Sequence, residues 1–182
     1  MRITGFAISK TDDIWNSELG RSFLPGADMK PEPLPRGMLA ANGLIVLEGL
    51  LRIARAAGDT YGHDYEAILI YWSVVVASVG RYLRNDDQIK LIESGGQPLP
   101  EEEHHPVSAR AIAEATGLPR ETVRRKIAAL VADGYLAQDS RGVRTLPGLL
   151  DQRGNAQVVS VAAREIKRMA QAMETMANRS EK

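Results

Sequence analysis

The sequence predicts a mainly α-helical protein that carries one small β-hairpin. Two observations lead to this fold class. Apolar residues recur at helical spacing over several long stretches, and one short stretch around Gly142 instead has the pattern of two strands joined by a tight turn. The length of 182 residues suits one good core with a small second module, and 44% hydrophobic and 25% charged residues are ordinary globular values.

Charge and composition exclude several classes of protein. The formal net charge is zero, so any attraction to nucleic acid must be local. The sequence contains no cysteine, which excludes disulfides and thiol chemistry and fits a reducing compartment. The first residues lack the apolar core of a signal peptide, and the apolar run 67–80 is shorter than the roughly 20 residues that span a membrane. We therefore expect a cytoplasmic protein without a membrane role.

The first two regions are an arm and a helical region. Four prolines before Gly37 predict an extended N-terminal arm over residues 1–36. Residues 37–95 follow as a helical core and dimerisation region. A first helix over 37–58 has apolar residues at positions 40, 44, 47, 51 and 54, and a second over 64–84 begins with Asp64 as its N-cap.

The second helix is apolar almost all round, which predicts deep burial. The two helices together are more apolar than one small subdomain can cover, so a dimer interface is the simplest use of the excess. Tyr71 and Trp72 could line a ligand pocket, but core positions are favoured. One more short helix is expected over 85–94.

The loop 94–106 precedes the most distinctive stretch and holds the run "EEEHHP" at 101–106. Histidines beside carboxylates occur in metal sites, but these residues are consecutive and lack a helical i, i+4 pair. A solvated acidic loop is therefore favoured over a metal site. No serine elbow or phosphate-loop spacing is present, so we expect no enzyme activity, no catalytic or metal-binding residues and no cofactor.

Two short helices are predicted over 107–133. Ser108 is a good N-cap for a helix over 109–116, Gly117 suits a sharp turn, and Pro119 suits the first position of the next helix. Val123 and Ile127 mark the buried stripe of that second helix. The opposite side carries Glu121 and Arg125, with Thr122 and Arg124 at its edges. Segment 108–146 has seven basic and four acidic residues, a local charge of +3.

A hairpin completes this stretch. Strands are expected over 135–138 and 143–146, joined by a tight turn at 139–142. Arg141 lies at the tip of the turn and Arg144 beside it. Such a wing suits an arginine on a phosphate or in a minor groove.

The stretch 107–146 resembles the winged helix-turn-helix of bacterial transcription regulators. "VSARAIAEATGLPRETVRRKIAALVADGYL" is similar in kind to the DNA-binding modules of the MarR, GntR and Crp types, and the resemblance covers about 40 of 182 residues. The likeness to GntR-type modules implies DNA contacts from Arg120, Thr122 and Arg124 and from Arg141-Gly142. Pro119 and Glu121 depart from the hydroxyl residues that those modules often carry. The MarR-like dimer plan is a weaker likeness.

The tail predicts a last helix, over about 156–178. Its apolar residues form a stripe with alternating spacings of three and four: Val159, Ala162, Ile166, Met169, Met173 and Met176. The stripe suits a helix packed on its own subunit or a two-fold helical interface, and the interface is favoured. Residues 149–182 are therefore expected to be a C-terminal dimerisation helix.

Together these features predict a winged helix-turn-helix module at 96–148, flanked by helices that form a dimerisation region. The expected function is sequence-specific control of transcription by a homodimer on double-stranded DNA. The helix 119–133 would lie in the major groove, and the wing 139–142 on the backbone or minor groove. The alternative is a winged-helix module for protein contacts, and a small-molecule effector stays open. The predicted DNA-binding residues are Ser108, Arg110, Arg120, Glu121, Thr122, Arg124, Arg125, Arg141, Gly142 and Arg144.

Overall fold

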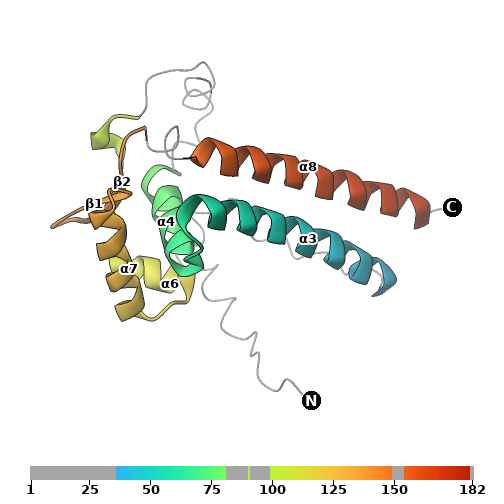
Figure 1. Ribbon diagram of the computed structural model, residues 1–182, viewed down its shortest axis with the longest axis horizontal. Coiled ribbons are helices and arrows are strands. Elements are labelled where there is room, and N and C mark those ends of the chain that lie inside the picture. Colours follow the sequence, from blue (N-terminus) through green and yellow to red (C-terminus); the bar gives the residue numbers. More distant parts are fainter. Residues whose placement is uncertain (1–35, 81–89, 91–98, 149–153, 181–182) are drawn as a thin grey trace, which may run out of the picture. The chain divides into compact units, whose positions relative to one another are not determined.

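The computed structural model describes residues 36–80, 90, 99–148 and 154–180 (Figure 1). They fall into two compact units. The winged unit consists of the described residues of Leu69–Gly148, and the helical pair consists of those of Lys30–Ile68 and Leu149–Lys182. The division runs through helix α4, so it does not follow the four predicted regions, which stay a prediction. The described elements are helices and one small antiparallel sheet, which confirms the predicted fold class. No described helix has the length and apolar character needed to cross a membrane.

The helical pair is built from α3 (Arg36–Tyr61) and α8 (Asn155–Ser180), which lie side by side (Figure 1). Gly49 of α3 permits this contact, because a Cβ there would collide with the side chain of Met169. The prediction that the first helix ends at Gly58 is wrong. The helix continues through Gly58, and the chain turns at Gly62 and His63, both at positive φ.

The packed face of α8 is displaced by one residue from part of the predicted apolar stripe. Val158 and Glu165 are buried, at 4% and 5% exposure, whereas Val159 and Ile166 are 60% and 57% exposed. Glu165 tolerates burial because its carboxylate accepts a hydrogen bond of 2.8 Å from Arg168. Hence α8 packs on its own chain, which was one of the two interpretations of the stripe. It also presents apolar residues outward.

Helix α4 (Tyr65–Val79) begins as predicted, because the Asp64 carboxylate accepts a hydrogen bond of 3.1 Å from the Ala67 N–H. It ends at Val79, five residues before the predicted end, and Gly80 follows in a turn. Residues 81–84 lie outside the described residues, as does the expected helix at 85–94 apart from Lys90, which is helical. Ile70, Tyr71 and Val74 are buried. The preference for a core position at Tyr71 is confirmed, and Trp72 is half-buried.

The rest of the winged unit consists of η3 (Glu101–Glu103), α6 (Ala109–Thr116), α7 (Arg120–Ala132), β1 (Leu136–Asp139) and β2 (Gly142–Thr145). The two strands are antiparallel, with Leu136 opposite Thr145 and Asp139 opposite Gly142. Val107 adds a bridge to Val143 through two backbone hydrogen bonds of 2.8 and 2.9 Å. Each strand is shifted by one residue from its predicted range. The core of the unit includes Ile112, Val123, Ile127, Leu136 and Val143.

Candidate nucleic-acid interface

The turn between α6 and α7 follows the prediction. Ser108 caps α6, because its hydroxyl accepts a hydrogen bond of 3.1 Å from the Ala111 N–H. Gly117 has φ 71° and donates its N–H to the carbonyl of Ala113, so it ends the helix in the left-handed conformation. Thr116 donates its hydroxyl to the Ile112 carbonyl at 2.7 Å. These contacts fix the angle at which α7 leaves the turn.

Pro119 is the N-cap of α7 and does not occupy its first helical position, so that detail of the prediction is wrong. Its ψ of 137° is extended, and its carbonyl accepts the first helical hydrogen bond, from the Val123 N–H at 3.0 Å. Proline provides no side-chain cap. The first backbone N–H groups of α7 therefore point out of the helix end without a capping side chain.

The exposed face of α7 carries the predicted charged residues. Arg120, Glu121, Arg124 and Arg125 are exposed, Thr122 is half-buried, and Val123 and Ile127 face the core. Arg124 donates two hydrogen bonds to Glu121, of 2.7 and 3.0 Å, from one turn away. This contact lowers the pKa of Glu121 and raises the pKa of Arg124.

Arginines in this module differ in what holds them. Arg110 donates a hydrogen bond of 2.8 Å to Glu114 on α6, which raises the pKa of Arg110. By contrast, neither Arg120 nor Arg125 hydrogen-bonds or ion-pairs with another described residue, and both side chains reach into solvent. Arg120 and Arg125 are therefore the two arginines on the exposed face that are most readily available to a ligand.

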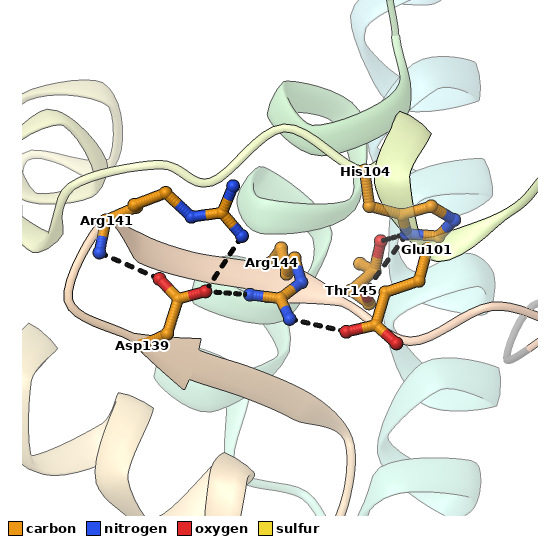
Figure 2. A network of polar contacts seen from close by, with 6 residues as sticks. All are labelled: Glu101, His104, Asp139, Arg141, Arg144 and Thr145. Atoms are coloured by element: carbon orange, nitrogen blue, oxygen red, sulfur yellow. Dashed lines mark hydrogen bonds and ion pairs between the residues drawn. The ribbon is translucent and has the colours of Figure 1, made fainter.

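The wing contains a four-residue ionic network (Figure 2). Asp139 accepts hydrogen bonds from the Arg141 N–H at 2.8 Å and from the Arg141 guanidinium at 3.2 Å. It also binds Arg144 at 2.6 Å, and Arg144 in turn binds Glu101 of η3 at 2.5 Å. These contacts, led by the Arg141 N–H, lower the pKa of Asp139 to about 2.

His104 contacts Thr145, the last residue of β2. Its side chain is buried, with Nδ1 at 2.8 Å from the hydroxyl and 3.0 Å from the carbonyl oxygen of Thr145 (Figure 2). Its Nε2 lies 3.2 Å from the Leu99 carbonyl oxygen. The expectation of a solvated acidic loop is thus wrong at this residue. Glu101, Glu102 and His105 are exposed, but His104 and Arg144 join this segment to β2.

The structure places the predicted DNA-binding residues on the exposed side of α7, in the wing and at the start of α6, where Arg110 is exposed. Four form the exposed side of α7, with Thr122 at its edge. Arg141 lies exposed in the wing turn, next to Gly142 at φ 145°, where a Cβ would lie 2.7 Å from the Val107 carbonyl oxygen. Ser108 serves as a helix cap, and Arg144 is only 12% exposed. The sequence predicted a solvated acidic loop at Glu101 and His104 and a hairpin turn at Asp139, but it did not predict their contacts with Arg144 and Thr145.

A family model matches this part of the chain: residues 101–140 match the IclR helix-turn-helix domain. This segment is a winged helix-turn-helix DNA-binding module of a transcription regulator. The prediction of such a module is confirmed, but the matching family is IclR and not MarR, GntR or Crp. The match ends at Ser140, before Arg141, and does not include α3, α4 or α8. No curated protein and no solved structure matches the chain.

Proposed function

We propose that the protein is a sequence-specific transcription regulator that binds double-stranded DNA as a homodimer. The observation that carries this proposal is the exposed side of α7, which lies within the IclR-type module and presents Arg120, Glu121, Arg124 and Arg125 to solvent. Helix-turn-helix modules read base edges with the N-terminal part of their second helix. In this module that part is the first half of α7.

Each side chain on α7 suits a particular contact. Arg125 is opposite the buried stripe and unpaired among the described residues, so it suits bidentate recognition of guanine. Glu121 suits an amino group of cytosine, once Arg124 leaves it for a phosphate. Arg120 and Thr122 lie near the helix start, where backbone phosphates approach a docked helix.

Contacts outside α7 position the module on the duplex. Arg141 at the wing tip and the adjacent backbone of Gly142 suit a phosphate or the minor groove, and Arg110 and Ser108 suit phosphates beside α6. We place Arg144 apart from these residues. Its two outer nitrogens already bind Asp139 and Glu101, so its contribution is to hold the wing.

The homodimer is proposed from the outer face of α3. This face carries three leucines at intervals of three and four residues, which is heptad spacing. They are Leu44, Leu47 and Leu51, which are 71%, 58% and 70% exposed. An exposed apolar stripe of this kind is typical of an association surface. A second copy would also present a second α7, and two such helices match the two half-sites of a palindromic operator.

The test is selection of bound sequences from random DNA, followed by binding of variants to the selected and a scrambled duplex. Arg125→Ala should weaken binding to the selected duplex by about 1–3 kcal/mol and affect the scrambled duplex much less. Glu121→Ala should lose little affinity and relax the choice at one base pair. Arg164→Ala, an exposed arginine on α8, is the matched control. If both α7 variants bound each duplex like the parent, α7 would not enter the groove, and a protein-contact module would be favoured.

A further inference from the structure

The wing tip and its anchor carry two arginines and two carboxylates, so their charges cancel. Arg141 and Arg144 are balanced by Asp139 and Glu101, and all four belong to one network (Figure 2). A wing that binds DNA only by attraction to phosphates would leave its arginines unpaired. The pairing of both arginines with carboxylates of the same chain therefore has to be explained.

The two arginines are held to different degrees. Arg144 is 12% exposed and binds both carboxylates at 2.5 and 2.6 Å, so it is fixed in place. Arg141 is 70% exposed, and its guanidinium makes one longer contact of 3.2 Å to Asp139. An exposed ion pair of this kind is weak and easily exchanged. Arg141 can therefore leave Asp139 for another anion, while Arg144 stays.

We propose that Asp139 is a positioning residue whose carboxylate binds Arg141 in place of a DNA phosphate. Its carboxylate holds the guanidinium at the wing tip in the free protein and gives it up to a phosphate of the DNA backbone on binding. The exchange breaks the ion pair with Asp139 when Arg141 binds the phosphate, so Asp139 limits the electrostatic part of the affinity. This inference rests on the proposed binding of DNA by the wing.

The expected result follows from counterion release. Each neutralised phosphate adds about 0.9 to the slope of log affinity against log salt. Asp139, however, then keeps only Arg144 as an ion-pair partner among the described residues, so it attracts cations from solution again. Asp139→Asn removes this uptake and keeps an oxygen that accepts the Arg141 N–H. We expect affinity to rise about two- to fivefold, the range of an exposed pair, and the slope to steepen by up to about one. The gain should be similar on selected and scrambled duplexes, because phosphate contacts carry no sequence information.

The experiment measures binding of the full chain to both duplexes at several salt concentrations, with thermal melts to check folding. Glu102→Gln is the matched control, because it removes one exposed carboxylate from η3 without touching the network. It should change affinity by less than Asp139→Asn. In an Arg141→Ala background the gain from Asp139→Asn should disappear, since the arginine that it releases is absent.

Three outcomes would overturn the inference. Weaker binding by a well-folded Asp139→Asn variant would mean that the carboxylate only shapes the turn for DNA. A gain that persists without Arg141, or that Glu102→Gln reproduces, would mean a general charge effect. If the parent protein binds DNA but Asp139→Asn does not bind more tightly, this inference alone is overturned. A parent that binds no duplex would instead overturn the proposed function, and this inference with it.

Discussion

The winged unit and the helical pair are both mainly helical, but they differ in how many large apolar side chains they leave exposed. In the winged unit Ile112 and Val123 are fully buried and Ile127 is 2% exposed. Polar side chains are buried there as well: Ser78, His104 and Thr145. In the helical pair, Leu44 and Leu51 are about 70% exposed. At the same time the polar side chains of Asn42, Asn155 and Glu165 are buried in that pair.

The exposed leucines of α3 support the proposed dimer, because in the described part of the winged unit the exposed large apolar side chains, Leu69 and Val76, are only 44% and 37% exposed. Among the described residues, buried side-chain atoms without a hydrogen-bond partner occur in both units: Asn42 Oδ1 and Arg168 Nη2 in the helical pair and Ser78 Oγ in the winged unit. These atoms therefore do not distinguish the two units, whereas the row of exposed leucines on α3 is typical of an association surface. The comparison can be tested by substitutions in each unit.

The largest expected effect is on the winged core. Ile127→Ala should destabilise the protein by about 2–5 kcal/mol, because the cavity would be closed on all sides. Leu51→Ala removes a similar side chain from α3 and should cost about 0.5 kcal/mol or less in a monomer. The measurement is chemical denaturation at low protein concentration, in which a probe in each unit monitors unfolding. Equal costs for both variants in a monomer would break the comparison.

A backbone substitution within the wing should follow in size. Gly142→Ala should cost about 3 kcal/mol, because φ 145° is strained for alanine and its Cβ would lie 2.7 Å from the Val107 carbonyl oxygen. Gly117→Ala is the control. It also has positive φ, 71°, but no atom lies within 4 Å of its Cβ, so we expect about 1 kcal/mol. If thermal melts showed that Gly117→Ala and Gly142→Ala lose equal stability, backbone strain alone and not the contact with Val107 would explain the cost at Gly142.

The helical pair is tested by its association. Sedimentation of the parent should give a dimer of about 40 kDa, twice the 19.9 kDa of one chain. Leu47→Asp should raise the dissociation constant at least tenfold, about 1.4 kcal/mol, because it places a carboxylate on the apolar stripe. Ala163→Asp, on an exposed position of α8, should leave the dimer intact. A parent that stays monomeric at micromolar concentration would contradict both the dimer and binding to a palindromic operator.

Features that depend on neighbours in the sequence were predictable. The Ser108 cap, the Gly117 turn and the buried residues of α7 each follow from spacings of three or four residues, and the structure has them. The strands were predicted to within one residue, because the turn at 139–142 restricts where they can pair. Pro119 was misplaced by one position, since proline suits both the cap and the first turn.

Features that depend on distant contacts were not predictable from the sequence. Glu101 meets Arg144 across 43 residues, and His104 meets Thr145 across 41, so no local spacing reports either contact. The spacing in α8 predicted a helix but not which side packs on α3. Burial of Glu165 could not be inferred either, because it depends on which side of α8 is covered, although its partner Arg168 is only three residues away.

The smallest expected effect concerns the acid stability of the wing. The pKa of Asp139 is lowered to about 2, and the largest cause is the hydrogen bond from the Arg141 N–H. A carboxyl whose folded pKa is depressed stabilises the fold above its unfolded pKa, about 3.9, and this contribution is lost as the pH falls through about 2. The stability difference between the parent and Asp139→Asn should therefore be constant above about pH 5 and shrink between about pH 4 and pH 2.

Arg141→Ala separates this effect from DNA binding. It removes the guanidinium but keeps the backbone N–H that lowers the pKa of Asp139 most. The pH dependence of the stability change caused by Asp139→Asn should therefore largely survive in the Arg141→Ala background, although the gain in DNA affinity should not. Denaturant unfolding at about pH 7 and pH 4, above both pKa values, and at about pH 2.5, between them, measures it. If the pH dependence vanished together with the guanidinium, the ion pair and not the turn would hold the carboxylate, and Arg141 would be less ready to leave it for DNA.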